Sequence, residues 1–416
     1  MSANAHLPGG NPAHPAVFMV LCAPFGVVSG FLSVAIGFLL SQAGVGVEEI
    51  AALVAASFIP QTWKFLWAPV ADTTLTAKRW YVIACVVSAA GVYAIAALPA
   101  TRASLPWLYA IAVLSSFATT FLAMAAESLL AYDTPPDRKG RASGWYQAGN
   151  LGGGGLGGGA GLWLAQVLPA PWMSGAILAA ACLACCLALR FIREPVRPPR
   201  GAHYGQDLAN VVRDLWSVVK ARSGMLALLI CFLPLGTGAA SGLWSAVAKD
   251  WSASADTVAL VTGVVGGIAS AIGCFMGGWV CDRMERKNAY ALFGLLLALC
   301  AVGMAAAPKT ENSYIVFTTI YSWISGLSYA GFTAIVLETI GQGAAATKYN
   351  VFASLSNVPI AYMIVVDGWA HGRFGADGML YVEAAFGVAA IGVFYAIVYA
   401  LRTLRPVRSV TGGGQA

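Results

Sequence analysis

Residues 278–287 read GWVCDRMERK, a charged run that ends one long apolar stretch and begins the next. The stretches on either side cover residues 255–281 and 289–307. Each is long enough to cross the ~30 Å hydrocarbon core of a bilayer as a helix. A few charged residues between two such stretches indicate a tight loop at a membrane surface, and the same pattern recurs along the whole chain.

Apolar segments of about one membrane thickness follow one another from residue 16 to residue 401. In lipid, backbone N–H and C=O groups are satisfied only in helices or closed barrels, and long segments without strict alternation predict helices. We expect six before a polar stretch and six after it, at 16–42, 47–70, 80–98, 105–131, 143–168 and 171–191, then 224–248, 255–281, 289–307, 313–340, 349–370 and 378–401. The predicted fold class is an all-α membrane protein with twelve transmembrane helices.

The composition agrees with a lipid environment. Of 416 residues, 59% are hydrophobic and only 10% are charged, which leaves too little polar surface to cover a water-soluble globule. We find no nucleophile with a base, no metal-ligand spacing and no nucleotide loop, since the glycine-rich run 152–159 lacks a following Gly-Lys-Ser/Thr. The sequence therefore predicts no enzyme activity, no catalytic residue, no metal site and no cofactor.

Basic residues predict the orientation. With both termini in the cytoplasm, nineteen of the 24 Lys and Arg residues fall on or beside the cytoplasmic side. The other five are Arg102, Lys249, Lys309 and Arg373 outside, and Lys64 within a span. This asymmetry is the positive-inside pattern. The net charge of +6 is thus explained by topology and contact with anionic lipid, and nothing favours a nucleic-acid partner.

The chain divides near its midpoint. We expect a six-helix half at 1–191, a cytoplasmic linker with an amphipathic helix at 192–222, and a second six-helix half at 223–416. Short echoes support this division, because Asp72 and Asp282 stand in corresponding loops 210 residues apart. An even number of spans in each half makes the two repeats parallel.

The motif Gly278-x-x-x-Asp282-Arg283-x-x-Arg286-Lys287 resembles the signature loop of the major facilitator superfamily. The copy after the second span is degraded, with Ala68 in place of the glycine. The resemblance implies two six-helix halves and transport by alternating access. In this superfamily the fifth and eighth helices are neighbours, so the glycine run implies a close contact between them.

Two short stretches narrow the resemblance. Residues 63–69 (WKFLWAP) and 350–357 (NVFASLSN) are similar to the AmpG-like permeases, a group of muropeptide permeases, acetyl-CoA transporters and siderophore importers. The siderophore importers of the group resemble this chain in being compact, which favours a siderophore as the substrate. This resemblance implies a monomer in a bacterial inner (plasma) membrane that exchanges a small-molecule substrate and protons.

Two charges inside the predicted spans are the sharpest clue to function. Lys64 precedes Asp72 by eight residues and Glu127 precedes Asp133 by six, so both lie roughly 10 Å inside the cytoplasmic boundary. A charge at that depth costs about a few kcal/mol unless it meets a partner or a water-filled cavity. We expect Lys64 to attract an anionic substrate and Glu127 to carry a proton. A static ion pair between them is the alternative.

Further candidates follow from the same reasoning. Asp72 and Asp282 are candidate gates, because a carboxylate beside arginines such as Arg283 and Arg286 can make charge-assisted hydrogen bonds in one conformation only. A loop that merely fixes topology is the alternative. Glu338 is a second candidate proton carrier at nearly the equivalent depth of the tenth span. Substrate-binding candidates besides Lys64 are Gln61, Tyr146, Asn150, Tyr321, Trp323 and Asn357.

Two classes of function remain open. The first is a secondary transporter, a proton-coupled importer of a small to medium polar or anionic solute, with a siderophore favoured and a muropeptide-like compound or a CoA ester as alternatives. The second is a membrane sensor or assembly protein that keeps the fold without transport. The intramembrane charges favour the first class, because an idle scaffold has no physical reason to bear their cost.

Overall fold

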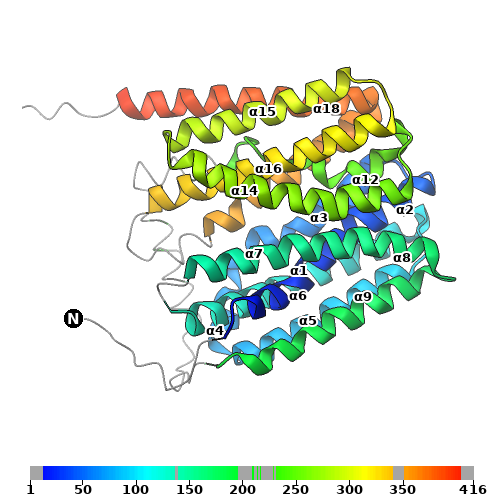
Figure 1. Cartoon of the computed structure of the whole chain (residues 1–416), viewed down its shortest axis with the longest axis vertical. Helices are drawn as coiled ribbons and strands as arrows, with labels where there is room; N and C mark the ends of the chain where they lie inside the picture. Colours follow the sequence, from blue (N-terminus) through cyan, green and yellow to red (C-terminus); the bar gives the residue numbers. More distant parts are fainter. Residues whose placement is uncertain are drawn as a thin grey trace, which may run out of the picture.

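The computed structural model describes residues 13–135, 139–194, 231–340 and 351–403, together with Ala209, Arg213, Trp216 and Leu228. Within these residues the chain is helical and contains no strand, and its long helices run side by side (Figure 1). Most of the predicted linker and its amphipathic helix lie outside the described residues. Seven described helical segments are long and apolar enough to cross a membrane.

Four of the seven apolar candidate spans belong to the first part of the chain, which forms six helical runs, several of them built from joined segments. Their bounds are α1 (Ala16–Gly30), η1 (Phe31–Ile36) and α2 (Gly37–Gln42); α3 (Val47–Trp63), η2 (Lys64–Leu66) and α4 (Ala68–Thr73); α5 (Ala77–Ala97); η3 (Arg102–Ser104) and α6 (Leu105–Asp133); α7 (Lys139–Gly155), η5 (Leu156–Ala160) and α8 (Gly161–Val167); and α9 (Pro171–Cys185) and η6 (Cys186–Phe191). These six match the predicted segments before the linker.

The second part matches the remaining predictions except at the seventh span, which is described only at Leu228 and from Cys231 onward. There the predicted continuous helix over 224–248 is wrong, because residues 233–238 are not helical and Gly236 and Gly238 have positive φ. The bounds of the second part are η7 (Ala239–Gly242), α12 (Trp244–Val247) and η8 (Ala248–Trp251); α13 (Ala255–Val258), η9 (Ala259–Val265) and α14 (Gly266–Cys281); α15 (Arg286–Ala306); α16 (Glu311–Ile340); and α18 (Asn357–Thr403). Gly375, with φ 72° and ψ −171°, divides α18 into the predicted eleventh and twelfth spans, because glycine adopts positive φ without steric cost.

The helix pairings repeat between the two parts. In the first, α5 packs against α6 and α9, and α3 packs against α6. In the second, α15 packs against α16 and α18, and α14 packs against α16. Between the parts, α3 packs against α18 and η5 packs against η9. The fold is therefore an all-α membrane bundle of two parallel repeats, as the sequence predicts.

Glycines allow the two parts to touch backbone to backbone. A Cβ added to Gly159 would lie 2.5 Å from the Ala259 carbonyl oxygen, and one added to Gly155 would lie 2.9 Å from that of Gly263. Real Cβ atoms do not approach this closely. The expected close contact between the fifth and eighth spans is present.

The same glycine run also seats the first span, a contact that the sequence analysis did not predict. A Cβ on Gly153 would lie 2.2 Å from the Ala23 carbonyl oxygen, and one on Gly157 would lie 2.2 Å from that of Val27. Residues spaced by four share one helix face, so α7 and η5 present this second glycine face to α1. The fifth span thus packs closely against both the first and the eighth spans only because its glycines have no side chains.

Serine hydroxyls join the two parts at the end of the bundle that carries α2 and α12, which we call the far end (Figure 1). Ser41 Oγ donates to the Ala246 carbonyl oxygen at 2.6 Å, and Ser245 Oγ donates to that of Ser33. Gly368 of α18 lies against Ala51 of α3, where an added Cβ would come within 2.3 Å of the alanine methyl. These contacts close the far end.

The glycine faces predict a sharp contrast between neighbouring residues. We expect Gly153→Ala to lower the free energy of unfolding by about 1–3 kcal/mol, the usual cost of overpacking, because the new methyl meets the α1 backbone. Gly152→Ala should not lower it, since nothing lies within 4 Å of a Cβ at that position. Thermal unfolding of the detergent-solubilised variants measures both, and equal stability of the two variants would contradict this packing.

Candidate functional site

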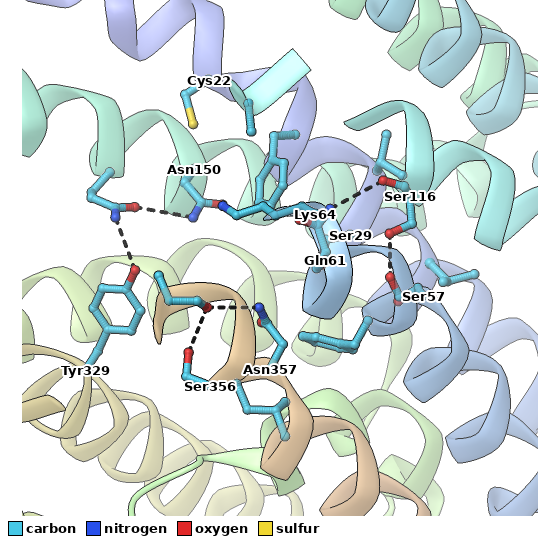
Figure 2. A pocket seen from close by; sticks show the side chains of 18 of the residues that line it. Cys22, Ser29, Ser57, Gln61, Lys64, Ser116, Asn150, Tyr329, Ser356 and Asn357 are labelled. Atoms are coloured by element: carbon cyan, nitrogen blue, oxygen red, sulfur yellow. Dashed lines mark hydrogen bonds between the residues drawn. The ribbon is translucent and has the colours of Figure 1, made fainter. Parts of the chain in front are cut away.

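A cavity of about 340 Å³ lies between the two parts, away from the far end of the bundle. Figure 2 shows side chains from both parts meeting around it. The first part contributes residues of α1, α3, η2, α6 and α7, and the second contributes α16 and residues 353–360. Its lining includes Lys64, Gln61, Glu127, Tyr146, Asn150 and Asn357 from the predicted site.

Lys64 reaches the cavity from a break in the second span. The α-helix ends at Trp63, and Lys64–Leu66 forms a short 3₁₀ turn in place of the continuous helix that the sequence predicted. Pro69 explains the break, since it lacks an N–H and its ring clashes with the carbonyl four residues earlier in a regular helix. The turn places the ammonium of Lys64 at the cavity wall, half-buried.

Glu127 lines the same cavity from α6. The Tyr146 hydroxyl lies 3.5 Å from Glu127 Oε1, at the outer limit of a hydrogen bond. The Lys64 and Glu127 side chains are both described, and they form no ion pair with each other in this conformation. The cavity therefore holds an ammonium and a carboxylate that are each accessible to a solute or to water.

Gln61 is held by the fourth span. Its Nε2 donates to Thr119 Oγ1 at 3.0 Å and lies 3.4 Å from the Ser116 carbonyl oxygen. Ser116 Oγ in turn donates to the Ser57 carbonyl oxygen. These bonds tie α3 to α6 and leave the Gln61 carbonyl oxygen without a partner among the described residues, so it can accept a hydrogen bond from a solute.

One chain of hydrogen bonds crosses between the two parts beside the cavity. Gln147 Nε2 donates to the Tyr329 hydroxyl at 3.2 Å, and Asn150 Nδ2 donates to Gln147 Oε1 at 3.3 Å (Figure 2). Asn150 and Gln147 belong to α7, whereas Tyr329 belongs to α16. This hydrogen-bond chain joins the two parts at the cavity, in addition to the helix contact of α7 with α14.

Asn357 faces the cavity from the second part, opposite Lys64 (Figure 2). Its Nδ2 donates to the carbonyl oxygens of Ala353 at 3.2 Å and Ser354 at 3.0 Å. These bonds cap the turn that precedes α18 and orient the amide. The cavity wall is thus polar on both sides.

Some residues of the predicted site do not line the cavity, and others have side chains outside the described residues. Tyr321 is 1% exposed and bonds to Glu383, and Trp323 packs against the core, so neither lines the cavity. The side chains of Asp72 and Glu338 lie outside the described residues.

The predicted gate residues of the signature loop lie at the membrane surface. Asp282 is exposed at the C-terminal end of α14. The Arg283 guanidinium stacks 3.7 Å from the centre of the Trp279 ring, and it also donates a hydrogen bond to the Trp279 backbone carbonyl oxygen at 3.3 Å. Arg286 begins α15 and is half-buried. The gate role of these residues remains a prediction.

Several lining residues were not in the predicted site. Cys22 and Ser29 come from α1, Thr333 and Tyr329 from α16, and Ser356 from the turn before α18. Small and hydroxylic residues are as common in packed spans as in cavities, so their identity carries little signal. The glycine face that packs α7 against α1 could have placed the first span beside the cavity, but the sequence analysis assigned the glycines only to the contact with the eighth span.

Comparison with characterised proteins gives a moderate likeness in sequence. The chain is similar to the anhydromuropeptide permease of Escherichia coli strain K12, with 24% identity over 332 residues. The same protein from Escherichia coli O157:H7 matches equally. The alignment covers 74% of this chain and 65% of each permease, so the chain spans less than two thirds of the length of these relatives.

Solved structures match over nearly the whole fold. The nucleoside transporter NupG matches with a TM-score of 0.70 and 13% identity, over 92% of this chain and 98% of that one. A POT family transporter in complex with a thioalcohol-conjugated peptide matches with a TM-score of 0.71 and 10% identity, over 93% and 96%. At these identities the likeness concerns the fold alone.

The family itself follows from a match that spans most of the chain. The model of the Major Facilitator Superfamily aligns with residues 17–363, which covers the first part of the bundle, the linker and the second part as far as α18. Together with the parallel repeats and the central cavity, this match identifies the chain as a membrane transporter that belongs to the Major Facilitator Superfamily.

Proposed function

We propose that this protein is a secondary transporter that works by alternating access and couples the import of a small to medium anionic solute to protons. The observation that carries the proposal is that the Lys64 ammonium and the Glu127 carboxylate line one cavity between the two parts without forming an ion pair with each other. Charges inside a bilayer are costly and mark solute or ion pathways. A sensor without transport has no use for them.

The cavity suits a solute with an acidic group and several hydrogen-bonding groups. Lys64 supplies the positive charge, and Gln61, Asn150 and Asn357 supply amides. A volume of about 340 Å³ lies at the low end of small-molecule sites, which run from ~300 to ~1,000 Å³. This size favours a siderophore over a CoA ester. The similarity to the anhydromuropeptide permeases makes a muropeptide-like solute the second candidate.

Proton coupling follows from charge compensation. An anion that binds Lys64 cancels the positive charge near Glu127 and thereby favours the protonated form of the carboxyl. With the proton bound, the loaded cavity carries less net charge than it would with the solute and an ionised Glu127, and it is in this state that the bundle rearranges. Release of the solute restores the ammonium and favours loss of the proton.

The conformation described here corresponds to the cavity facing the cytoplasm, if both termini are cytoplasmic as the basic residues predict. Ser41 and Ser245 hold the far end closed. Opening to the outside requires these bonds to break while the Gln147–Tyr329 side closes further. Rocking of one part against the other over the glycine contact provides this motion.

Transport in proteoliposomes tests the proposal directly. With an imposed inward proton gradient, we expect saturable uptake of a siderophore, and a muropeptide and a CoA ester serve as competing solutes. Glu127→Gln should abolish uptake driven by the gradient but retain exchange of labelled for unlabelled solute, because exchange needs no net proton movement. Wild-type gradient-driven uptake by Glu127→Gln would exclude Glu127 as the carrier, and no saturable uptake of any solute would favour the sensor.

The charge of Lys64 gives a second prediction. Lys64→Gln removes a charged hydrogen-bond donor, whose contribution is about 1.5–3 kcal/mol, so the KM for the anionic solute should rise roughly tenfold to a hundredfold. Lys64→Arg keeps the charge and should retain most of the affinity. Initial uptake rates measured against solute concentration separate KM from the maximal rate. An unchanged KM in the glutamine variant would place the solute elsewhere.

Thiol labelling tests the conformation. In a background with the nine native cysteines replaced, Ser29→Cys should react with a membrane-impermeant thiol reagent applied from the side of the termini, because residue 29 is exposed in the cavity. Ser41→Cys should stay unlabelled from either side, because residue 41 is 5% exposed at the closed far end. Faster labelling at position 41 than at position 29 would show that the resting protein faces outward.

A further inference from the structure

A second group of carboxyls lies inside the bundle, away from the cavity and from Lys64. Asp367 and Glu383 come from the two arms of α18 on either side of Gly375, and their carboxyl groups are neighbours. Asp367 is 0% exposed and Glu383 is 8% exposed. Asp367 falls in the predicted span 349–370 and Glu383 in the predicted span 378–401.

The two carboxyls differ in their hydrogen bonds. Glu383 accepts one bond from the Tyr321 hydroxyl and another from the Ala240 N–H at 3.1 Å, so each of its oxygens has a donor. Neither oxygen of Asp367 has a hydrogen-bond partner among the described residues. An unpaired buried carboxylate is much more costly than an unpaired neutral carboxyl. The bonding pattern therefore fits an ionised Glu383 beside a protonated Asp367.

No cation compensates this pair in the described part of the molecule. Of the basic groups on α18 and the elements around it, His371 bonds Asp250 at 2.7 Å, Lys309 pairs with Asp377, and Arg373 and Lys249 are exposed at the surface. The other titratable groups that face α18 are the Tyr321 hydroxyl, the Cys300 thiol of α15 and the Glu48 carboxyl of α3. None of these adds positive charge. Two adjacent carboxyls in such a site retain at least one proton between them.

A second, smaller pocket adjoins the solute cavity. A pocket of about 60 Å³, room for more than one water molecule, is lined by Thr237, Ser325 and Ser328 and shares Tyr329, Phe332, Ser356 and Ile360 with the main cavity. The hydroxyl oxygens of Ser325 and Ser328 are buried and have no hydrogen-bond partner among the described residues. A Cβ on Gly238 would lie 2.7 Å from Ser325 Oγ and 3.9 Å from the Tyr321 ring, so this backbone turn packs against both Ser325 and the tyrosine that bonds Glu383.

We propose that Asp367 and Glu383 form a second proton-binding site of this transporter, which exchanges its proton with the solute cavity through Ser325 and Tyr321. Asp367 holds the proton and donates it to Glu383 or, through the hydroxyls of Tyr321 and Ser325, to the cavity. Each transfer moves one proton between oxygen atoms and needs no other reactant. The contribution of this proton to coupling rests on the proposed transport function, whereas its presence and exchange do not.

Infrared difference spectroscopy of the purified full-length protein tests occupancy and exchange without any transport. At neutral pH the wild type should show the C=O stretch of a protonated carboxyl, and this band should shift in D₂O because the site exchanges with the cavity. Asp367→Asn should lose the band. Asp377→Asn, a change in an exposed carboxyl of the same helix, should keep it.

Each experiment has a result that would overturn one part of the proposal. Absence of the band in the wild type, its persistence in both Asp367→Asn and Glu383→Gln, or a band that never shifts in D₂O would overturn the site. Ser325→Val should slow the D₂O shift at least severalfold, and an unchanged rate would overturn the route. In proteoliposomes, Asp367→Asn should move fewer protons per solute than the wild type, and an equal ratio would overturn the coupling role. If no solute is transported at all, the infrared result still decides the site.

Discussion

The cost of placing charge and unpaired backbone groups in lipid is the constraint on which this structure depends. It makes every span a helix, and it directs the few ionisable side chains inward. Lys64 and Glu127 lie in one central cavity, and Asp367 and Glu383 lie in a second, drier site. The outward surface of the spans is left to large apolar side chains such as Phe275, which is 84% exposed and suits contact with acyl chains.

The two interior sites use opposite solutions to that constraint. In the cavity, unlike charges remain separate and accessible, so a solute or a proton can change the balance between them. In the second site, like groups share protons, and Tyr321 and the Ala240 N–H stabilise the negative charge that remains. Small side chains and glycines make both possible, because they let helices approach until polar backbone and hydroxyl groups close the gaps between the parts.

Sequence reasoning predicted the spans and the parallel repeats well, because length and hydropathy follow directly from membrane thickness. It also placed Lys64 and Glu127 at the cavity, because the cost of an intramembrane charge can be read from one residue. It missed the 3₁₀ turn at Lys64–Leu66, although Pro69 was a visible cause. It placed Tyr321 at a substrate site, where the structure shows a bond to Glu383. That contact depends on how α16 and α18 pack in three dimensions, and the sequence around Tyr321 does not show it. Glu383 itself was within reach, since it is a charge inside the predicted span 378–401.

The closed far end has a further consequence for how the molecule responds to its surroundings. Its cross-part bonds run from the neutral hydroxyls of Ser41 and Ser245 to carbonyl oxygens, whereas the described ion pairs at that end, such as Arg102 with Glu49, each stay within one part. Ionic strength screens charges and leaves hydroxyl bonds nearly untouched. The hydrogen bonds that join the two parts at the far end are therefore insensitive to salt, and water can replace each of them where the parts separate.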